Sequence, residues 1–245
     1  MTGEFAIRVL GPVDVVTSTG DVPIGGNRAR RLLATLIVSV GRAVPISYLR
    51  QIVWGDQPPA AADNTLQTYI SQLRHALGTE TVALVEHSYR LDIDPGRIDA
   101  VQFERLLDEA TDTRDDAERC RQLCRQALHL WRGRPFGDFA DDEPFALEAY
   151  RLDELRLAAM ELALTSELTL GRHELIIGEL ESAVIEHPYH EGLWYLLIDA
   201  LARSDRRVEA LRACTRLRAI LAEAGLEAGD QLTEREQSIL HGADH

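Results

Sequence analysis

A helix expected over residues 61–77 carries side chains whose types and spacing suit contact with nucleic acid. At 100° per residue its apolar side chains form one stripe about 60° wide, which consists of Leu66, Ile70, Leu73 and Leu77. The opposite face holds short or neutral polar side chains in place of the Glu and Lys mixture typical of a solvated helix. Such side chains suit base edges and phosphates in a major groove. We expect DNA contacts from Asn64, Thr65, Gln67, Thr68, Ser71, Gln72, Arg74 and His75.

Four further arginines are candidates for the phosphate backbone. Arg28, Arg30 and Arg31 begin the first expected helix, and Arg90 lies in an expected hairpin. A hairpin tip of this kind projects toward the DNA backbone or the minor groove, so Arg90 is a strong candidate. The three helix arginines suit either phosphate contact or ordinary solvation and salt bridging.

The elements that must position these residues follow from the patterning. Residues 4–24 alternate apolar and polar side chains as short strands do. A first helix is expected from an N-cap at Asn27 to Gly41, and a second from an N-cap at Ser47 to Gly55. Residues 82–93 return to period two as a hairpin around residues 86–88. Strands, three helices and a terminal hairpin predict a winged helix-turn-helix whose third helix reads DNA.

The turn between the second and third helices is a candidate protein contact. It contains a proline pair that no helix interior accepts. Related winged helices present this turn to RNA polymerase, and a turn that only joins two helices is the alternative. Its residues are Asp56, Gln57, Pro58 and Pro59.

From about Asp99 onward, long amphipathic helices replace the strands. They are expected over residues 100–112, 115–131, 144–170, 173–187, 190–204, 207–224 and 232–240, with an irregular acidic loop before the third. A weak repeat of about 33 residues pairs Leu164 with Leu197 and Leu168 with Leu201, which is close to the tetratricopeptide period. The predicted fold is therefore mainly α with a small β component. It comprises a winged helix-turn-helix over residues 1–97 and an all-α, tetratricopeptide-like domain over residues 98–245.

Composition restricts the function. The net charge is -14, and all 26 basic residues are arginines because the sequence contains no lysine. The absence of lysine excludes the enzyme classes that need a P-loop lysine, an ATP-binding kinase lysine or a Schiff-base lysine. Residues 1–100 carry nine arginines and ten acidic residues, so the acidity lies almost entirely in the second part, which predicts different partners for the two parts.

Neither an enzyme nor a metal protein is indicated. No catalytic constellation is visible, and we expect no cofactor and no metal site. Cys120 and Cys124 continue an apolar stripe and are expected in the core. His187 and His190 flank Pro188, which favours a turn between helices over a metal pair. The N-terminus lacks the features of a signal peptide, and no apolar run is long enough to span a membrane, so a cytoplasmic protein is expected.

The sequence resembles the Streptomyces antibiotic regulatory protein family. Its most specific run is WGDQPPAAADNTLQTYISQLRHALG over residues 54–78, supported by LGPVDV, GGNRARRLLATL and SYRLDID. The later runs LWRGRPFGDFADDEPF, RLDELRLAAMEL and LGRHELIIGELESAVIEHPYHEGLW resemble the bacterial transcriptional activation domain of the same family. The resemblance covers essentially the whole chain.

This resemblance implies a transcription activator that binds direct repeats near a promoter, with two copies side by side. It also implies recruitment of RNA polymerase through the sigma factor and other subunits, and targets in secondary metabolism. The sequence departs from the family at Gln72 and His75, where many relatives have arginine, and at Ser88, where many have glycine. Each lost cation removes about one phosphate contact and predicts weaker binding.

Two other functions remain open from the residues alone. The reduced positive charge of the third helix suits an interaction adaptor whose winged helix has lost useful DNA affinity. A sensor that binds a small metabolite in the helical groove has no residue in its favour.

Overall fold

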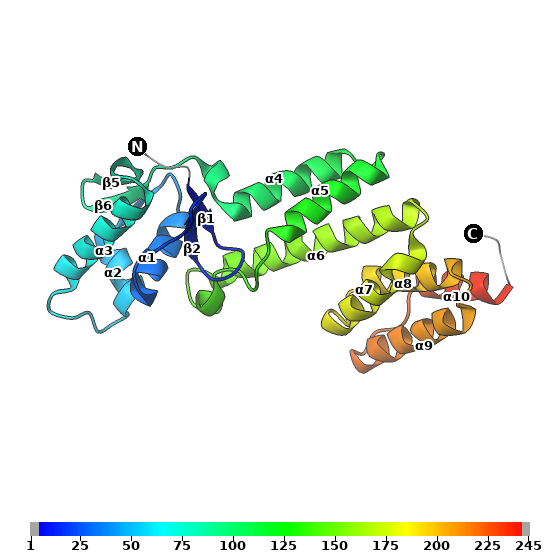
Figure 1. Cartoon of the computed structure of the whole chain (residues 1–245). Helices are drawn as coiled ribbons and strands as arrows, with labels where there is room; N and C mark the ends of the chain where they lie inside the picture. The colour runs from blue at the N-terminus through cyan, green and yellow to red at the C-terminus, as the bar shows by residue number, and fades with distance from the viewer. Residues whose placement is uncertain (1–4, 242–245) are drawn as a thin grey trace. The chain divides into compact units, whose positions relative to one another are not determined.

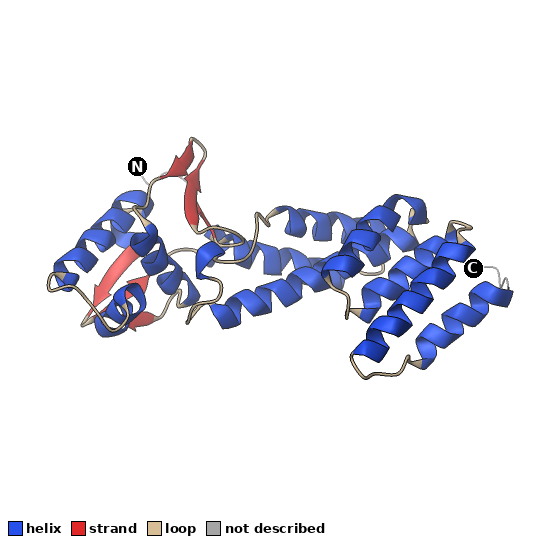
Figure 2. Cartoon of the chain, turned by 90° about the horizontal axis from the view of Figure 1, so that it is seen from below, coloured by secondary structure: helices blue, strands red, loops and turns tan. Residues whose placement is uncertain are grey.

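The computed structural model describes residues 5–241, which form two compact units. The first unit contains the residues up to 108 together with 126–157, and the second contains 109–125 together with the residues from 158 onward. Within the described residues, strands occur only in the first unit, and the remainder is helical (Figure 2). The predicted mainly α fold with a small β component is confirmed.

The first sheet consists of β1 (Phe5–Arg8), β2 (Asp14–Thr17) and β3 (Gly20–Val22), antiparallel and in that order. Ile7 lies opposite Val15, and both side chains are fully buried. Alternate residues of β1 therefore face the core, as the period of two predicts. Glu4, the expected start of this region, lies outside the described residues.

The winged helix follows, with α1 (Asn27–Val38), α2 (Ile46–Trp54) and α3 (Ala62–Leu77). A second antiparallel sheet has the order β4 (Ala43–Pro45), β6 (Ser88–Leu91) and β5 (Val82–Val85), after a short 3-10 turn at Thr79–Thr81. The helices and this sheet share a core to which α1 contributes Leu32 and Leu36, and α2 contributes Leu49. The third expected helix and the expected hairpin are thus present.

Two local predictions were wrong, and one strand was missed. Asn27 and Ser47 lie inside α1 and α2, because Gly26 and Pro45 occupy the N-cap positions without a side-chain cap. β4 pairs with β6 through Val44 and Tyr89, and both are buried. Three residues are too few to establish a period of two, so the sequence did not reveal this strand.

The chain then enters α4 (Asp99–Asp112) after a 3-10 turn at Pro95–Arg97, and returns along α5 (Ala117–His129). The two helices run antiparallel (Figure 1). In the first unit the rings of Phe103 and Trp131 meet edge to face, with centroids 5.3 Å apart. In the second unit Arg119 of α5 pairs with Glu109 of α4.

Asp99, the first residue of α4, is a buried acid that holds the N-terminal chain. Its side chain accepts hydrogen bonds from the backbone amides of Val9, at 2.8 Å, and Leu10, at 3.1 Å. The residue is only 5% exposed, and burial raises the pKa of its carboxyl above the ordinary value, against the lowering effect of these two bonds. The guanidinium of Arg132 lies 3.8 Å away. Asp99 thus joins the strand region to the first helical hairpin.

The segment between α5 and α6 (Ala146–Thr169) is irregular, as expected for the acidic loop, with a 3-10 turn at Gly137–Phe139. Phe136, Phe139 and Phe145 are all less than 5% exposed, and the ring of Phe145 contacts the rings of the other two. The segment is therefore held in the first unit by a buried cluster of three phenylalanines, although its sequence is rich in acidic residues.

The second unit continues with α7 (His173–Glu186), α8 (Glu191–Arg203), α9 (Arg207–Glu223) and α10 (Asp230–His241). Consecutive helices pack on one another. The expected repeat matches this packing, since its paired positions are buried at Leu164 and Leu197 and again at Leu168 and Leu201. His187 and His190 flank the turn from α7 to α8, as predicted.

None of the helices within residues 5–241 combines the length and the apolar character needed to cross a membrane.

Candidate nucleic-acid interface

The third helix of the winged helix has one buried face and one exposed face. Leu66, Ile70, Leu73 and Leu77 are each at most 2% exposed. The side opposite this stripe carries the expected polar residues. Those that the structure leaves exposed are Asn64, Gln67, Thr68, Ser71, Gln72 and His75, while Thr65 and Arg74 are half-buried. The helix therefore offers a continuous polar surface about four turns long.

Two threonines on this surface use their hydroxyl protons within the helix. The hydroxyl of Thr68 donates to the carbonyl of Asn64 at 2.9 Å, and that of Thr65 donates to the carbonyl of Ala61 at 3.0 Å. Each side chain therefore presents acceptor lone pairs and a methyl group outward. Acceptors match the amino groups of adenine and cytosine, and a methyl group matches that of thymine.

Gln72 lies against the start of α1. A Cβ at Gly25 would come within 2.7 Å of its Oε1, and Gly25 has a φ of +94°. The positive φ is what favours glycine at this position. This contact brings the amino end of α1 beside the middle of the polar surface of α3.

Arg74 uses part of its guanidinium for hydrogen bonds within the protein. Its Nε and Nη2 donate to the carbonyl of Val82 at 2.9 and 2.7 Å. The bonds connect the last turn of α3 to the first residue of β5. The guanidinium keeps its charge near the surface, but two of its donors are used.

Arg90 lies on β6 of the hairpin and pairs with a carboxylate two residues further along the chain. Its Nε and Nη2 donate to the two oxygens of Asp92 at 2.6 and 2.8 Å. The pair lowers the pKa of Asp92 and raises that of Arg90, mainly through these hydrogen bonds. Both side chains are exposed by more than a third, so solvent weakens the pair and a phosphate can compete for Arg90.

The arginines of α1 fall into two kinds. Arg28 and Arg30 are exposed, and neither has an ion pair or a hydrogen-bonded side-chain partner among the described residues. Arg31 instead pairs with Asp142, with Nη1 and Oδ2 2.9 Å apart. Arg28 and Arg30 are therefore the free cations at this end of α1.

A hollow of about 560 Å³ lies between the start of α2, the first half of α3 and the hairpin turn. Its polar lining comes from three elements and comprises Ser47, Arg50, Asp63, Gln67, His87 and Ser88. Arg50 pairs with Asp63 at 3.2 Å. Arg50 and His87 were not predicted to belong to this surface, because only the pairing of β6 with β4 brings the hairpin turn to the start of α2.

The turn between α2 and α3 is open to solvent. Asp56, Gln57, Pro58 and Pro59 are all exposed. A partner could therefore reach this turn without any rearrangement of the winged helix.

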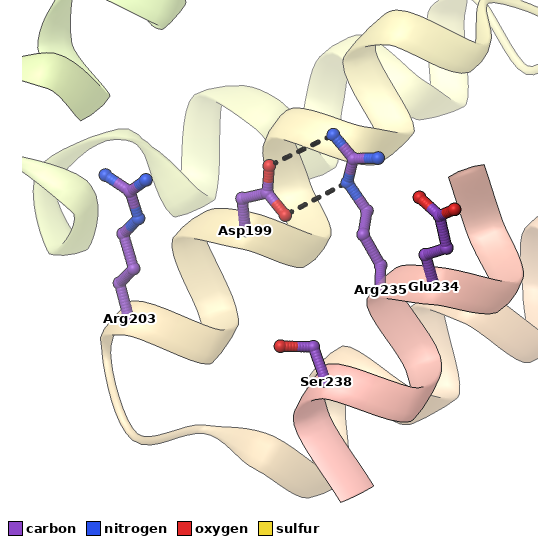
Figure 3. A pocket seen from close by; sticks show the side chains of 5 residues that line it. All are labelled: Asp199, Arg203, Glu234, Arg235 and Ser238. Carbon is purple, nitrogen blue, oxygen red and sulfur yellow. Dashed lines mark hydrogen bonds and ion pairs between the residues drawn. The ribbon is translucent and has the colours of Figure 1, made fainter. Parts of the chain in front are cut away.

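A second hollow, of about 270 Å³, lies between α8 and α10 in the second unit (Figure 3). Asp199 of α8 accepts two hydrogen bonds from Arg235 of α10, at 3.1 and 3.4 Å. The guanidinium of Arg235 also lies 4.5 Å from the centre of the Tyr195 ring. Asp199 and Arg235 thus satisfy each other's charge.

The three cysteines lie in the core of the second unit, as expected for Cys120 and Cys124. Burial and the neighbouring Cys120 raise the pKa of Cys124 to about 12, and burial raises that of Cys214 to about 11. Both thiols therefore stay protonated at neutral pH. Within residues 5–241 no cluster of three or more His, Cys, Asp or Glu side chains has the arrangement of a metal site.

Two families match the chain. Residues 98–240 match the bacterial transcriptional activator domain, and residues 24–90 match the family described as transcriptional regulatory protein, C terminal. The second match spans α1, α2, α3 and most of the hairpin. The first spans the helices from α4 into α10.

Curated relatives align along nearly the whole chain. The regulatory protein DnrI of Streptomyces peucetius is 36% identical, over 96% of this chain and 91% of its own length. The transcriptional regulator RedD of Streptomyces coelicolor is 31% identical, over 97% of this chain and 71% of its own length. The regulatory protein AfsR of the same species is 32% identical over 98% of this chain, which spans only 24% of the longer protein.

A solved structure shares the fold. The chain is similar to Mycobacterium tuberculosis EmbR in complex with a low affinity phosphopeptide, with a TM-score of 0.89 and 29% identity. The match covers 99% of this chain and 66% of that one. The two family matches, the aligned relatives and the shared winged-helix and helical folds give one answer: the chain belongs to the Streptomyces antibiotic regulatory protein family of transcriptional activators.

Proposed function

We propose that the chain is a sequence-specific DNA-binding activator that reads direct repeats near a promoter and recruits RNA polymerase. The observation that carries the proposal is the exposed polar face of α3, opposite a fully buried apolar stripe. A helix of this kind can enter a major groove without disturbing the core. Membership of a family of transcriptional activators supports the same function.

In this proposal the polar side chains of α3 read base edges and the arginines position the protein on the backbone. Thr68 and Ser71 lie at the centre of the reading face, and Asn64, Thr65, Gln67, Gln72 and His75 surround them. Arg28 and Arg30 bind phosphates from the start of α1. Arg90 exchanges Asp92 for a phosphate, and Arg74 contributes the charge that its bonds to Val82 leave near the surface.

Polymerase contact is assigned to two parts of the chain. The exposed turn over residues 56–59 faces polymerase from the winged helix, and the acidic helical region contacts the sigma factor or other subunits. Net negative charge after residue 100 favours basic partner surfaces over DNA. We place the functional boundary between the two parts near residue 97.

Direct repeats imply two copies side by side on one face of the duplex. The target genes in this proposal belong to secondary metabolism, and the protein acts in the cytoplasm, where promoters and polymerase are. The family consists of transcriptional regulators, and the proposal assigns the chain no catalytic step and no cofactor.

Selection of random DNA by the purified protein tests the proposal. We expect enrichment of a repeated motif whose two copies lie about one helical turn, roughly 10 bp, apart. The selected site, placed upstream of a weak promoter, should then increase transcription by purified polymerase holoenzyme. Recovery of no motif at low salt, with holoenzyme present, would reject the proposal.

One observation favours an interaction adaptor as a second candidate. Arg74 and Arg90 are both hydrogen-bonded within the protein, so the reading surface has fewer free cations than its sequence suggests. An adaptor would bind holoenzyme with the same affinity whether or not DNA is present. Enrichment of a motif in the selection excludes this candidate.

A further inference from the structure

Backbone hydrogen bonds join the segment between α5 and α6 to the turn after β1, at the edge of the first sheet. The amide of Arg132 donates to the carbonyl of Leu10, and the amide of Phe136 donates to that of Val9, each at 2.8 Å. Asp99 accepts from the amides of the same two residues, Val9 and Leu10. The turn after β1 is therefore held from both sides by residues that follow the winged helix in sequence.

Two glycines permit this close approach. A Cβ at Gly11 would lie 3.0 Å from the Cβ of Arg132, and a Cβ at Gly137 would lie 3.0 Å from the Cα of Pro12. Gly11 and Gly137 also have φ values of +151° and +55°. Larger residues would push the segment away from the sheet.

The side chain of Arg31 on α1 reaches this segment. Its guanidinium pairs with Asp142 at 2.9 Å and lies 5.5 and 5.9 Å from the ring centres of Phe139 and Phe145. A cation at these distances from two aromatic faces is attracted to both. Its side chain is only 26% exposed, and its Nε is buried. Arg31 is thus committed to the segment before α6, in contrast to its neighbours Arg28 and Arg30.

We propose that Arg31 is a positioning residue that couples the DNA reader to the activation region, and that it is not a phosphate ligand. It holds α1 against residues 139–145, which lead directly into α6. The inference rests on the proposed function, because coupling matters only if the winged helix binds DNA and the helical region contacts polymerase.

The contact of Arg31 with residues 139–145 matters because it limits the relative motion of two linked parts of the chain. Two domains joined by a chain move relative to each other unless a substantial interface fixes them. A site held in one orientation presents a higher effective concentration to its partner than a site that samples many orientations. Loosening this contact should therefore reduce activation for each bound protein and leave DNA affinity unchanged.

The test compares four single variants of the full chain on the selected DNA site. Arg28→Ala and Arg30→Ala remove the arginines assigned to phosphates, Arg31→Ala removes the coupling cation, and Asp142→Ala removes its partner. The salt dependence of binding counts the phosphate contacts, and transcription by holoenzyme is measured at protein concentrations that saturate the site. Circular dichroism confirms that each variant is folded.

We expect Arg28→Ala and Arg30→Ala each to reduce the magnitude of the slope of log K against log salt by about one. Arg31→Ala and Asp142→Ala should leave this slope unchanged. Transcription at saturation should fall about fivefold or more for Arg31→Ala and Asp142→Ala, the factor that corresponds to roughly 1 kcal/mol. The Arg31→Ala, Asp142→Ala double variant should lose no more than either single variant.

Other outcomes separate the two proposals. A slope reduced by about one for Arg31→Ala would overturn the coupling role and leave the proposed DNA reader intact. Unchanged transcription for both Arg31→Ala and Asp142→Ala would also overturn it. If the wild-type chain selects no DNA motif at all, the proposed function fails, and the coupling role fails with it.

Discussion

Replacing Asp99 tests how the strand region is attached to the helices. In Asp99→Ala the amides of Val9 and Leu10 lose their acceptor, and both residues are fully buried. An orphaned buried donor costs about 1–3 kcal/mol. Two amides lose their acceptor, and removal of the desolvated carboxylate offsets only part of this cost. We therefore expect a net loss of about 2–4 kcal/mol in the free energy of unfolding at neutral pH. Asp99→Asn keeps one acceptor and should lose about half as much.

Urea unfolding in a Trp194→Phe background, followed by the fluorescence of Trp54 and Trp131, measures this loss, since these two tryptophans lie in the first unit. Asp108→Ala, an exposed acid on the same helix, serves as the control and should change stability by less than about 0.5 kcal/mol. The reasoning would be refuted if Asp99→Ala cost no more than this control.

The pH dependence has a defined sign. Burial raises the pKa of Asp99 above its ordinary value of 3.8. The folded state therefore holds the proton in a range of pH where the unfolded state has lost it. The contribution of Asp99 to stability is complete below pH 3.8 and declines as the pH rises through its folded pKa. Asp99→Asn should remove this decline from the pH profile.

Three further changes have defined outcomes. Leu73→Ala empties a fully buried position of α3 and should cost about 3 kcal/mol in urea unfolding, whereas a loss below about 1 kcal/mol would place this face outside the core. Asp92→Asn removes the carboxylate that competes with phosphate for Arg90 and should strengthen DNA binding at every salt concentration with the slope unchanged, so an unchanged affinity argues against a phosphate contact of Arg90. Gly25→Ala forces a side chain to a φ of +94° and should cost about 1–2 kcal/mol, while Gly26→Ala, with open space around it, should cost less.

The helices were predictable because their cores are amphipathic. The stripe of Leu66, Ile70, Leu73 and Leu77 determined which face of α3 is buried, and its opposite face followed from geometry. The hydrophobic period of the later helices likewise predicted which of their faces are buried. Patterns of this kind are local, so one sequence is enough to read them.

The partners of individual charged side chains were not predictable, because they depend on residues that are separated in sequence and meet only in the folded structure. Arg74 bonds a carbonyl on the next strand, and Arg31 meets an ion partner and two rings more than 100 residues later. The phenylalanines of the segment before α6 determine its packing. The proline and glycine content predicted the irregular backbone but not the surface against which it packs.

The most direct test of the proposed reader compares specific and non-specific binding by a variant of its central face. Fluorescence anisotropy gives dissociation constants of the wild type and of the Thr68→Ala, Ser71→Ala double variant, each for the selected site and for a scrambled duplex. We predict that the double variant loses about tenfold or more of the preference for the selected site, because each lost base contact is worth about 1–3 kcal/mol, while affinity for the scrambled duplex stays the same. An unchanged preference would contradict the assignment of α3 as the helix that reads DNA.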